Sequence, residues 1–202
     1  MAQRPLAGWK YDIRIGVDGC AGTAAILQRN HIKFWASPVN VGTYVMANSL
    51  IALGPADVYA RFDADDYMLP TYLQTVIPLA LQYGMAQAGY RVGRLYSKPR
   101  VGQVTMTAET LERLGGFAEY RCHCDRDLSR RAALIGIDIR GMRHDKRLAL
   151  PLFIKGVNRE SLTHNSKVGC GSKYRKRVRA ILTERRAAGQ LKIIPQTTGL
   201  KQ

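Results

Sequence analysis

Hydrophobic and polar residues follow two different periods along the first part of the chain. Segment 11–19 alternates β-branched and polar residues up to an Asp-Gly turn, which is typical of a strand that runs into a loop. Segments 31–37 and 57–62 are expected to be strands as well. Segments 23–30 and 42–53 carry small and apolar residues at helical spacing. Strands and helices that alternate in this way predict an α/β fold.

The rest of the chain continues the alternation. A helix is expected over residues 71–84, with a bend or a break at Pro78. A β-rich segment, 90–107, leads into a helix within 108–117 that two glycines terminate. Residues 124–136 have the pattern of an amphipathic helix that ends at a glycine. We therefore expect a Rossmann-like, mainly parallel sheet with helices on both faces.

Acidic residues follow two of the predicted strands. Asp18 comes at the end of segment 11–19, and Asp63, Asp65 and Asp66 come directly after segment 57–62. In parallel α/β sheets, ligands bind beyond the carboxyl ends of the strands. We therefore expect these carboxylates to face one crevice.

The crowding of three carboxylates within residues 63–66 needs a physical reason. Carboxylates this close repel one another unless they share a cation. Oxygen ligands suit Mg²⁺ or Mn²⁺, which commonly bind one or two protein carboxylates together with phosphate oxygens of a substrate. We favour a divalent metal site at this cluster over the alternative, a solvated acidic turn.

The charge of the whole chain is strongly positive. Its 202 residues include 31 Lys and Arg against 15 Asp and Glu, which gives a net charge of +16. A hydrophobic content of 46% is ordinary for a globular protein and argues against a disordered chain. A field of this sign attracts phosphate-bearing partners or anionic lipid surfaces.

The positive charge is concentrated near the C-terminus. Between Lys167 and Lys192 the chain contains many cations and a single acid, Glu184. A helix with cations over much of its surface either faces solvent or contacts phosphate groups. The candidates for acceptor or phosphate binding are Lys173, Arg175, Lys176, Arg177 and Arg179. We expect residues 1–165 to form the main domain and residues 166–202 to form a basic, helical C-terminal extension.

The sequence contains no pattern of a membrane span or of a signal peptide. No apolar run reaches the roughly 18 to 20 residues that a span requires, and residues 1–12 lack the apolar stretch of a secretory signal. We expect a soluble, cytoplasmic protein without a transmembrane segment. Its four cysteines are too few and too irregularly spaced for a disulfide framework. We favour free thiols at Cys122 and Cys124, and a zinc site that also includes His123 is the alternative.

Three blocks of sequence, residues 11–27, 40–73 and 114–136, contain most of these motifs. In their order and spacing, the three blocks resemble the family 2 glycosyltransferases of the GT-A fold. The resemblance implies inverting transfer of a sugar from a nucleotide-sugar donor, expected to be a UDP-sugar. It also implies Mn²⁺ or Mg²⁺ as the cofactor.

The resemblance assigns roles to individual acids. Asp63 and Asp65 match the DXD motif of the family, with Asp65 as the direct metal ligand and Asp66 beside it. Asp125 falls at the position of the catalytic base, which takes a proton from the acceptor hydroxyl as that oxygen attacks the anomeric carbon. The alternative for Asp125 is a carboxylate that only stabilises a helix N-terminus. Asp127 is expected to serve the same helix start or to orient an acceptor.

The resemblance also assigns residues to the donor. Asp18 falls where the family places an acid that contacts the nucleotide base. Asn40 and Gly42 match the turn that opens the donor-side helix, and Asn48 lies at the position of a recurrent asparagine of that helix. His164 is expected to replace a histidine of the family as a third metal or phosphate contact.

Two features of the resemblance bear on the pocket and on assembly. The chain begins just before the second strand of the family, so we expect part of the nucleotide pocket to come from other residues or from a second chain in an oligomer. His144 is the alternative to His164 as the metal or phosphate contact.

The net charge suggests the acceptor. A polyanion suits a cationic transferase, and we expect nucleic acid, with a hydroxylated base in DNA as the acceptor hydroxyl. Some viruses glycosylate such bases to protect their genomes, which extends the expected location to the cytoplasm of an infected host cell. A teichoic-type polymer, a lipid-linked glycan and a protein are the other acceptors that the charge allows.

Two further functions remain open from the sequence. Hydrolases that transfer phosphoryl groups also use a D-x-D motif after a strand, with the first aspartate as the nucleophile. A basic nucleic-acid-binding protein on a GT-A scaffold without turnover is the non-enzymatic alternative.

Overall fold

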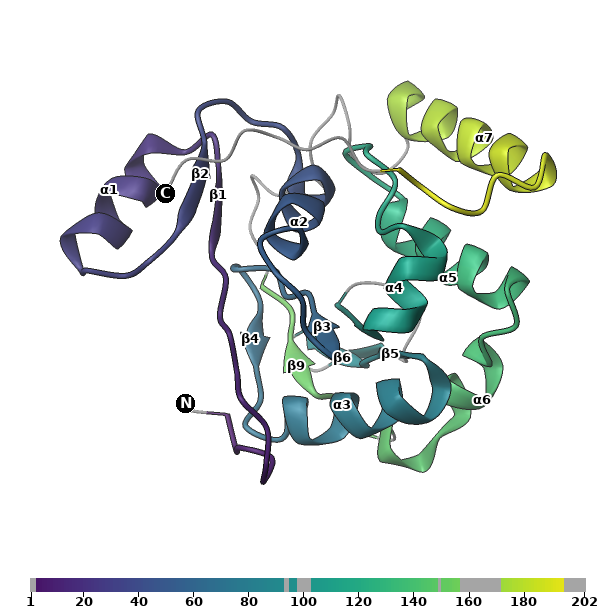
Figure 1. Ribbon diagram of the computed structural model, residues 1–202, viewed down its shortest axis with the longest axis horizontal. Helices are drawn as coiled ribbons and strands as arrows, with labels where there is room; N and C mark the ends of the chain where they lie inside the picture. The colour runs from purple at the N-terminus through teal and green to yellow at the C-terminus, as the bar shows by residue number, and fades with distance from the viewer. Residues whose placement is uncertain (1–2, 93–94, 98–102, 149, 157–171, 195–202) are drawn as a thin grey trace.

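Figure 1 shows the fold of the computed structural model, in which helices pack around small sheets. The structure describes residues 3–92, 95–97, 103–148, 150–156 and 172–194. Helices and strands alternate along the chain, so the predicted α/β class is confirmed. Across these ranges, no helix combines the length and the hydropathy that a membrane span requires.

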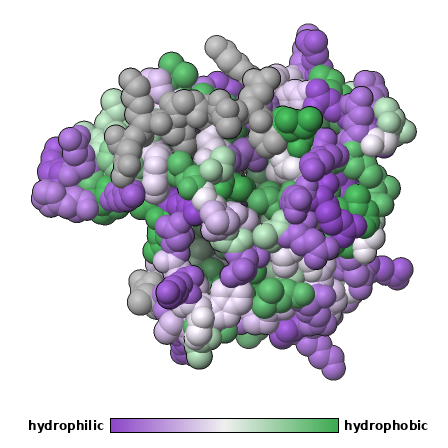
Figure 2. All heavy atoms as spheres, viewed as in Figure 1, coloured by the Kyte–Doolittle hydropathy of each residue, from purple (hydrophilic) through white to green (hydrophobic). Residues whose placement is uncertain are grey.

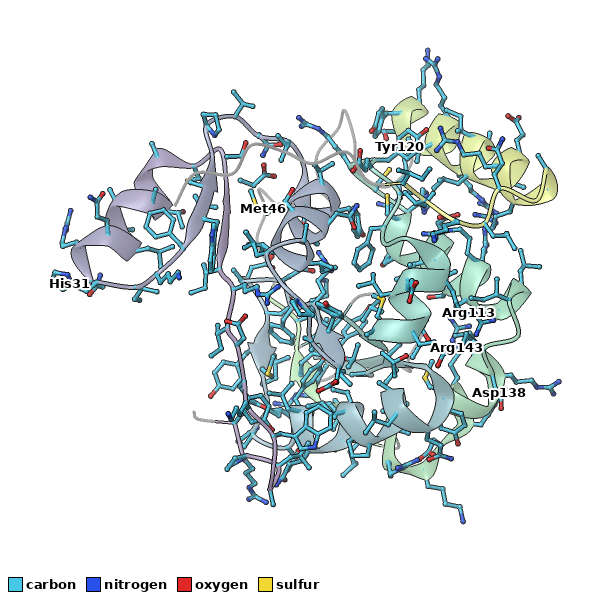
Figure 3. All side chains as sticks on the ribbon, viewed as in Figure 1. His31, Met46, Arg113, Tyr120, Asp138 and Arg143 are labelled. Atoms are coloured by element: carbon cyan, nitrogen blue, oxygen red, sulfur yellow. The ribbon has the colours of Figure 1, made fainter. Side chains whose placement is uncertain are left out.

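The first sheet is a parallel pair of strands joined by a helix. Its elements are β1 (Gly16–Asp18), α1 (Ala21–Arg29) and β2 (Trp35–Ser37). Helix α1 buries none of its side chains and lies at one edge of the molecule in Figure 1. At Gly16, β1 closely approaches α2 (Thr43–Ile51), because a Cβ there would lie 2.6 Å from Met46 Cγ. Met46, labelled in Figure 3, therefore packs between α2 and β1.

The second sheet is antiparallel and has the strand order β3, β8, β5. Its strands are β3 (Val58–Ala60), β5 (Met85–Gln87) and β8 (Val104–Thr107). Helix α3 (Tyr72–Tyr83) packs against this sheet with its apolar face. The helix continues through Pro78, which excludes a break there and leaves the bend as the prediction, and it ends before Gly84, whose φ of 81° is left-handed.

The third sheet has the strand order β4, β9, β6, β7. Its strands are β4 (Tyr67–Met68), β6 (Tyr90–Val92), β7 (Leu95–Ser97) and β9 (Phe153–Ile154). Strands β6 and β9 run parallel, and the other two pairs are antiparallel. This sheet brings residues near 154 next to the chain that follows the acidic cluster.

The prediction of a mainly parallel sheet is wrong. Only β1–β2 and β6–β9 are parallel pairs among the described strands, and the remaining pairs are antiparallel. Between β3 and β8 the chain passes through α3 and parts of two sheets, and it returns in the opposite direction. A parallel pair needs a crossover that returns in the same direction. The hydrophobic pattern locates strands but does not specify the direction in which they pair.

The main core joins α3 to the second and third sheets. Tyr72, Leu79, Met85 and Phe153 are all fully buried in it. The rings of Phe62, Tyr72 and Phe153 meet edge to face, with centroids 5.3 to 6.3 Å apart. Because Phe62 immediately precedes Asp63, this aromatic cluster fixes the point at which the chain leaves β3 toward the acidic cluster.

The remaining helices cover the other side of the molecule. They are α4 (Ala108–Leu114), α5 (Cys124–Leu134), α6 (Ile139–His144), the 3₁₀ turn η1 (Lys146–Leu148) and α7 (Lys173–Ala187). The predicted basic helix is therefore present as α7. Its Val178 and Leu182 belong to the main core, and Arg185 lies over the ring of Tyr120, labelled in Figure 3.

A buried charge network also ties α7 to α5. Arg131 is 1% exposed and donates to Asp127 Oδ2 at 2.7 Å and to the carbonyls of Leu114, Gly116 and Leu191 at 2.8 to 3.0 Å. Arg186 of α7 pairs with the other oxygen of Asp127. Asp127 is 2% exposed, so it serves this network and has no surface with which to orient an acceptor. The boundary between 1–165 and 166–202 stays a prediction, although α7 shares the core of the domain.

Candidate active site

Asp18 holds the turn that opens α2. Its Oδ1 accepts from the backbone N–H of Val41 at 2.6 Å, and its Oδ2 accepts from that of Gly42 at 3.0 Å. Gly42 has a φ of 101°, which favours glycine, and it is the residue before the first turn of α2. Asn40 lies in the same turn, and its carbonyl accepts from Arg121 at 3.3 Å. Asp18, Asn40 and Gly42 therefore lie together, as the sequence predicts.

This turn leaves acceptor capacity on Asp18. A carboxylate has about four lone-pair directions, and two are used by the backbone of the turn. Gly19 allows the close contact of the two segments, since a Cβ there would lie 2.3 Å from the backbone nitrogen of Asn40. The arrangement positions a carboxylate at the N-terminus of α2, where a base or ribose donor group can reach its free lone pairs.

Asn48 has a different role. It is buried, its Nδ2 donates to the carbonyl of Phe117 at 2.9 Å, and its Oδ1 accepts from the N–H of Phe117 at 3.0 Å. Both ends of the amide are used to attach α2 to the loop before α5. The predicted donor contact of Asn48 is untested, and the structure shows a scaffold role for its side chain.

Arg61 lies at the centre of the candidate site and was missed by the sequence reasoning. Its side chain is 11% exposed, pairs with Asp63 and donates to Thr43 Oγ1 at 2.9 Å. It also lies 5.0 Å from the ring centroid of Tyr44. Burial lowers the pKa of Arg61, but neighbouring groups that include Asp63 and Asp125 outweigh this effect, and the net pKa is raised. Both residues follow the last residue of β3, and their spacing of two was the available signal, since residues two apart in an extended segment share a face.

Asp66 is held by residues from distant parts of the chain. Its side chain is 1% exposed, and it accepts from Gln103 Nε2 at 2.5 Å and from the N–H of Gly156 at 2.9 Å. Lys155 Nζ lies 3.7 Å from the same carboxylate. Burial raises the pKa of Asp66, and Lys155 acts in the opposite direction. The buried position suits a carboxylate that organises the loop rather than one that faces solvent.

Gln103 connects two of the three acids. Its Oε1 accepts from the backbone N–H of Asp63 at 3.1 Å, and its Nε2 reaches Asp63 Oδ2 at 3.3 Å as well as Asp66. Gln103 is 1% exposed, so this bridge lies in the interior. Gln103 and Lys155 were both missed by the sequence reasoning, because no local pattern links them to the acidic cluster.

Asp65 differs from its two neighbours. It is exposed, and its carboxylate has no hydrogen-bond or ion-pair partner within the described ranges. Gly156 approaches its backbone closely, since a Cβ on Gly156 would lie 1.8 Å from the carbonyl oxygen of Asp65. The loop is thus fixed by its backbone while the Asp65 side chain remains available to a ligand.

The residues of the acidic cluster are compatible with a divalent cation. The three carboxylates do not converge into a cage, and no group of three or more His, Cys, Asp or Glu that could hold a metal occurs in the part of the chain that the structure describes. A cage is not required, because Mg²⁺ commonly takes only one or two protein carboxylates and completes its shell with water and substrate phosphate. Asp65, together with the remaining lone pairs of Asp63, supplies that number. His164 lies outside the described residues.

Asp125 is in the first turn of α5 and is partly buried. Its Oδ1 accepts from the N–H of Arg126 at 2.8 Å. Asp125 contributes to the raised pKa values of both Tyr44, where burial is the larger cause, and Arg61. The hydrogen bond to the backbone of Arg126 is the helix-start role that was the alternative for this residue.

The surroundings of Cys122 and Cys124, at the start of α5, favour the protonated thiols. The Cys124 thiol donates to the carbonyl of Tyr120 at 3.2 Å, and burial strongly raises its pKa. Burial also raises the pKa of Cys122. Zinc binds the thiolate, so these environments favour the free thiols that were expected over the zinc alternative.

The predicted phosphate contacts are spread around α7. Arg175 donates to His123 Nε2 at 3.2 Å, which links the start of α7 to the residue before α5. Lys173, Lys176, Arg177 and Arg179 are exposed. Among these five, Arg175 alone hydrogen-bonds to a residue near Asp125 in the part of the chain that the structure describes.

Comparisons with known proteins give no further guide to function. Neither the protein-family models nor the curated proteins include a match to this chain. The function has therefore to be argued from the site. Its chemical content is an exposed carboxylate, Asp65, in an ordered acidic loop, and a second, partly buried carboxylate, Asp125, in the first turn of α5.

Proposed function

We propose that this protein is a metal-dependent inverting glycosyltransferase of the GT-A type. The observation that carries the proposal is the ordered acidic loop that follows β3, in which Arg61 pairs with Asp63 while the carboxylate of Asp65 is exposed. Such a transfer needs one carboxylate to take a proton and a separate acidic group to hold a metal near the leaving group. The order of the sequence motifs supports the same assignment.

In this proposal Asp125 is the general base. It takes the proton from the acceptor hydroxyl while that oxygen forms a bond to the anomeric carbon of the donor. The bond between the anomeric carbon and the diphosphate oxygen breaks on the opposite face, and the electron pair leaves with the nucleoside diphosphate. Mn²⁺ or Mg²⁺, when bound, offsets the negative charge on that leaving group. Asp65 and Asp63 would hold the metal.

Arg61 is a positioning residue in this scheme. Its fixed guanidinium keeps Asp63 in one orientation and links the metal side of the site to Thr43 at the start of α2. The turn formed by Asp18 and Gly42 would receive the nucleoside of the donor, with a UDP-sugar as the expected donor. The scheme does not depend on oligomer formation.

The acceptor is the least constrained part of the proposal. We infer a hydroxylated base in DNA, supported by the net charge of +16 and by the exposed cations of α7. Titration with duplex DNA at low salt should give binding that weakens as salt increases. Absence of binding at low salt would remove nucleic acid as the acceptor and leave the donor chemistry unaffected.

The metal assignment is tested by Asp65→Ala. This change should abolish Mn²⁺-dependent release of nucleoside diphosphate from nucleotide sugars, because it removes the exposed carboxylate of the cluster. The matched control is Asp57→Ala, which removes another exposed aspartate at the opposite end of β3. Equal release by both variants contradicts the proposal.

Asp65→Ala also distinguishes a glycosyltransferase from the two other functions that the sequence leaves open. A nucleic-acid-binding protein without turnover is favoured by the cations of α7, and it predicts unchanged DNA affinity with no donor hydrolysis in either form of the protein. A phosphoryl-transfer hydrolase would act on a generic aryl phosphate and would require Asp63 as a nucleophile. Asp63 is paired with Arg61 and bonded to Gln103, which favours an organising role over attack.

A further inference from the structure

A second charged site lies between α5 and α7, away from the acidic cluster. Its lining consists of His123, Arg126, Asp127, Arg130, Arg179, Leu182 and Arg186. We call these residues the arginine pocket. Figure 1 shows α7 beside α5, and Figure 2 shows hydrophilic residues gathered over this side of the molecule.

The pocket is built by two facing helix surfaces. His123, the residue before α5, and positions 126, 127 and 130 of α5 follow the spacing of one helical face. Positions 179, 182 and 186 do the same on α7. The pairing of Arg186 with Asp127 holds the two faces together. Asp125 lies on a different side of α5, so the arginine pocket is separate from the candidate active site.

The cations of the pocket lack compensating charge. Arg126, Arg130 and Arg179 are exposed, and their guanidinium groups have no hydrogen-bond or ion-pair partner in the described part of the chain. The one carboxylate in the lining, Asp127, is already shared between Arg131 and Arg186. Like charges held this close repel one another. An anion that enters the pocket removes that repulsion.

The chemistry of the lining selects the kind of anion. Guanidinium groups present planar pairs of N–H donors that match phosphate oxygens. Donors from both helices surround the space, which suits a tetrahedral anion that accepts from several directions. Leu182 is 2% exposed at the base of the pocket, and apolar surface there strengthens the electrostatic attraction.

The pKa of His123 is affected by the arginines around it. Burial lowers its pKa, and Arg175, Arg126 and Arg179 lower it further. Arg175 donates to its Nε2, which is the geometry of a neutral imidazole.

We propose that the arginine pocket binds a phosphate group. The phosphate belongs either to a small anion or to the backbone of a nucleic acid, and the chemistry of recognition is the same for both. This inference goes beyond the proposed function, because phosphate binding in this pocket does not require sugar transfer.

The test uses the double variant Arg126→Gln with Arg130→Gln in the full chain. Neither side chain has a partner to lose in the described residues, so the fold should be retained, as circular dichroism can verify. The matched control is Arg29→Gln with Arg140→Gln, which removes the same charge from two exposed arginines on α1 and α6. Binding is measured by calorimetry without any nucleotide sugar, with inorganic phosphate and with a short single-stranded oligodeoxynucleotide as separate probes.

The pocket variant should bind inorganic phosphate at least about tenfold more weakly than the wild type, since each charge-assisted hydrogen bond contributes measurably to affinity. The control should change affinity by less than about twofold. If the pocket variant also weakens oligonucleotide binding tenfold, the source is a backbone phosphate, and if it weakens phosphate binding alone, the source is a small anion. Equal affinities of wild type, control and pocket variant for both probes would overturn the inference. If the wild type binds phosphate in this pocket but transfers no sugar, the proposed function is wrong and the inference about the pocket still holds.

Discussion

The acidic cluster and the arginine pocket are both concentrations of like charge, but the protein treats them differently. Asp63 and Asp66 have partners in Arg61, in Gln103 and in residues 155–156. Arg126, Arg130 and Arg179 have no such partners in the described residues. The acidic cluster is therefore ordered by the fold itself, whereas the arginine pocket is compensated only when an anion binds.

The two sites should therefore differ in how mutations change the stability of the fold. Removing a partner from the acidic cluster leaves a buried group unsatisfied and should reduce stability. Removing an exposed arginine from the pocket relieves repulsion and should leave stability nearly unchanged or improved. Asp127, the one carboxylate of the pocket, belongs to the first case, because both of its oxygens are used by Arg131 and Arg186.

The largest expected effect is that of Asp127→Asn. This change leaves Arg131, which is 1% exposed, without its charge partner, and breaking a buried pair on one side costs about 3 to 5 kcal/mol. Urea unfolding measures the loss. The control Asp57→Asn, at an exposed position, should change the free energy of unfolding by less than about 0.5 kcal/mol. A loss below about 1 kcal/mol for Asp127→Asn would mean that Arg131 does not depend on this carboxylate.

A smaller effect is expected for Gln103→Ala. The change removes the bridge between the backbone of Asp63 and the carboxylate of Asp66, and it should lower the free energy of unfolding by about 1 to 3 kcal/mol. The same denaturation experiment measures it, with Gln28→Ala at an exposed position of α1 as the control. Equal stability of the two variants would show that the acidic cluster is not ordered by Gln103.

The smallest expected effect is the pH dependence contributed by His123. Its folded pKa is lowered by burial and by Arg175 and Arg126, so the folded state binds fewer protons than the unfolded state below pH 6.5. Stability from this group is thus present above pH 6.5 and is lost as the pH falls through the folded pKa. NMR titration, with the resonance assigned through His123→Gln, should give a pKa below 6.5.

Adding phosphate should change the pKa of His123 and so tests the arginine pocket. An anion in the arginine pocket offsets the positive field that depresses His123, so saturating phosphate should raise the measured pKa toward its ordinary value. The double variant Arg126→Gln with Arg130→Gln should begin from a higher pKa and respond little to phosphate. A pKa that is the same in all four conditions would contradict the proposed field.

The sequence predicts the helices of this fold better than its sheets. The expected helices at 42–53 and 71–84 correspond to α2 and α3, because their periodicity is local and, for α3, a glycine terminates the helix. The strand expected over 11–19 is much shorter, since only Gly16–Asp18 finds a pairing partner in β2. Strand direction depends on how the chain returns over long distances, and local patterning does not encode it.

The residues of the candidate site also differ in how well the sequence predicts them. Asp18 and Gly42 were both assigned to the donor side from their motifs, and the structure brings them into contact. Gln103 and Gly156 lie 40 and 90 residues from the acids they bind, so no sequence window contains both partners. The arginines of the pocket come from α5 as well as α7, whereas sequence reasoning considered α7 alone.

The central claim is that Asp125 takes the proton in a sugar transfer organised by the acidic cluster. The most direct test compares wild type and Asp125→Asn with a nucleotide sugar, Mn²⁺ and an acceptor, and measures donor-induced thermal stabilisation together with transfer. We predict that Asp125→Asn keeps the stabilisation by the donor and loses transfer by at least about 10²-fold, the contribution typical of a general base. Transfer by Asp125→Asn at the wild-type rate would contradict the account.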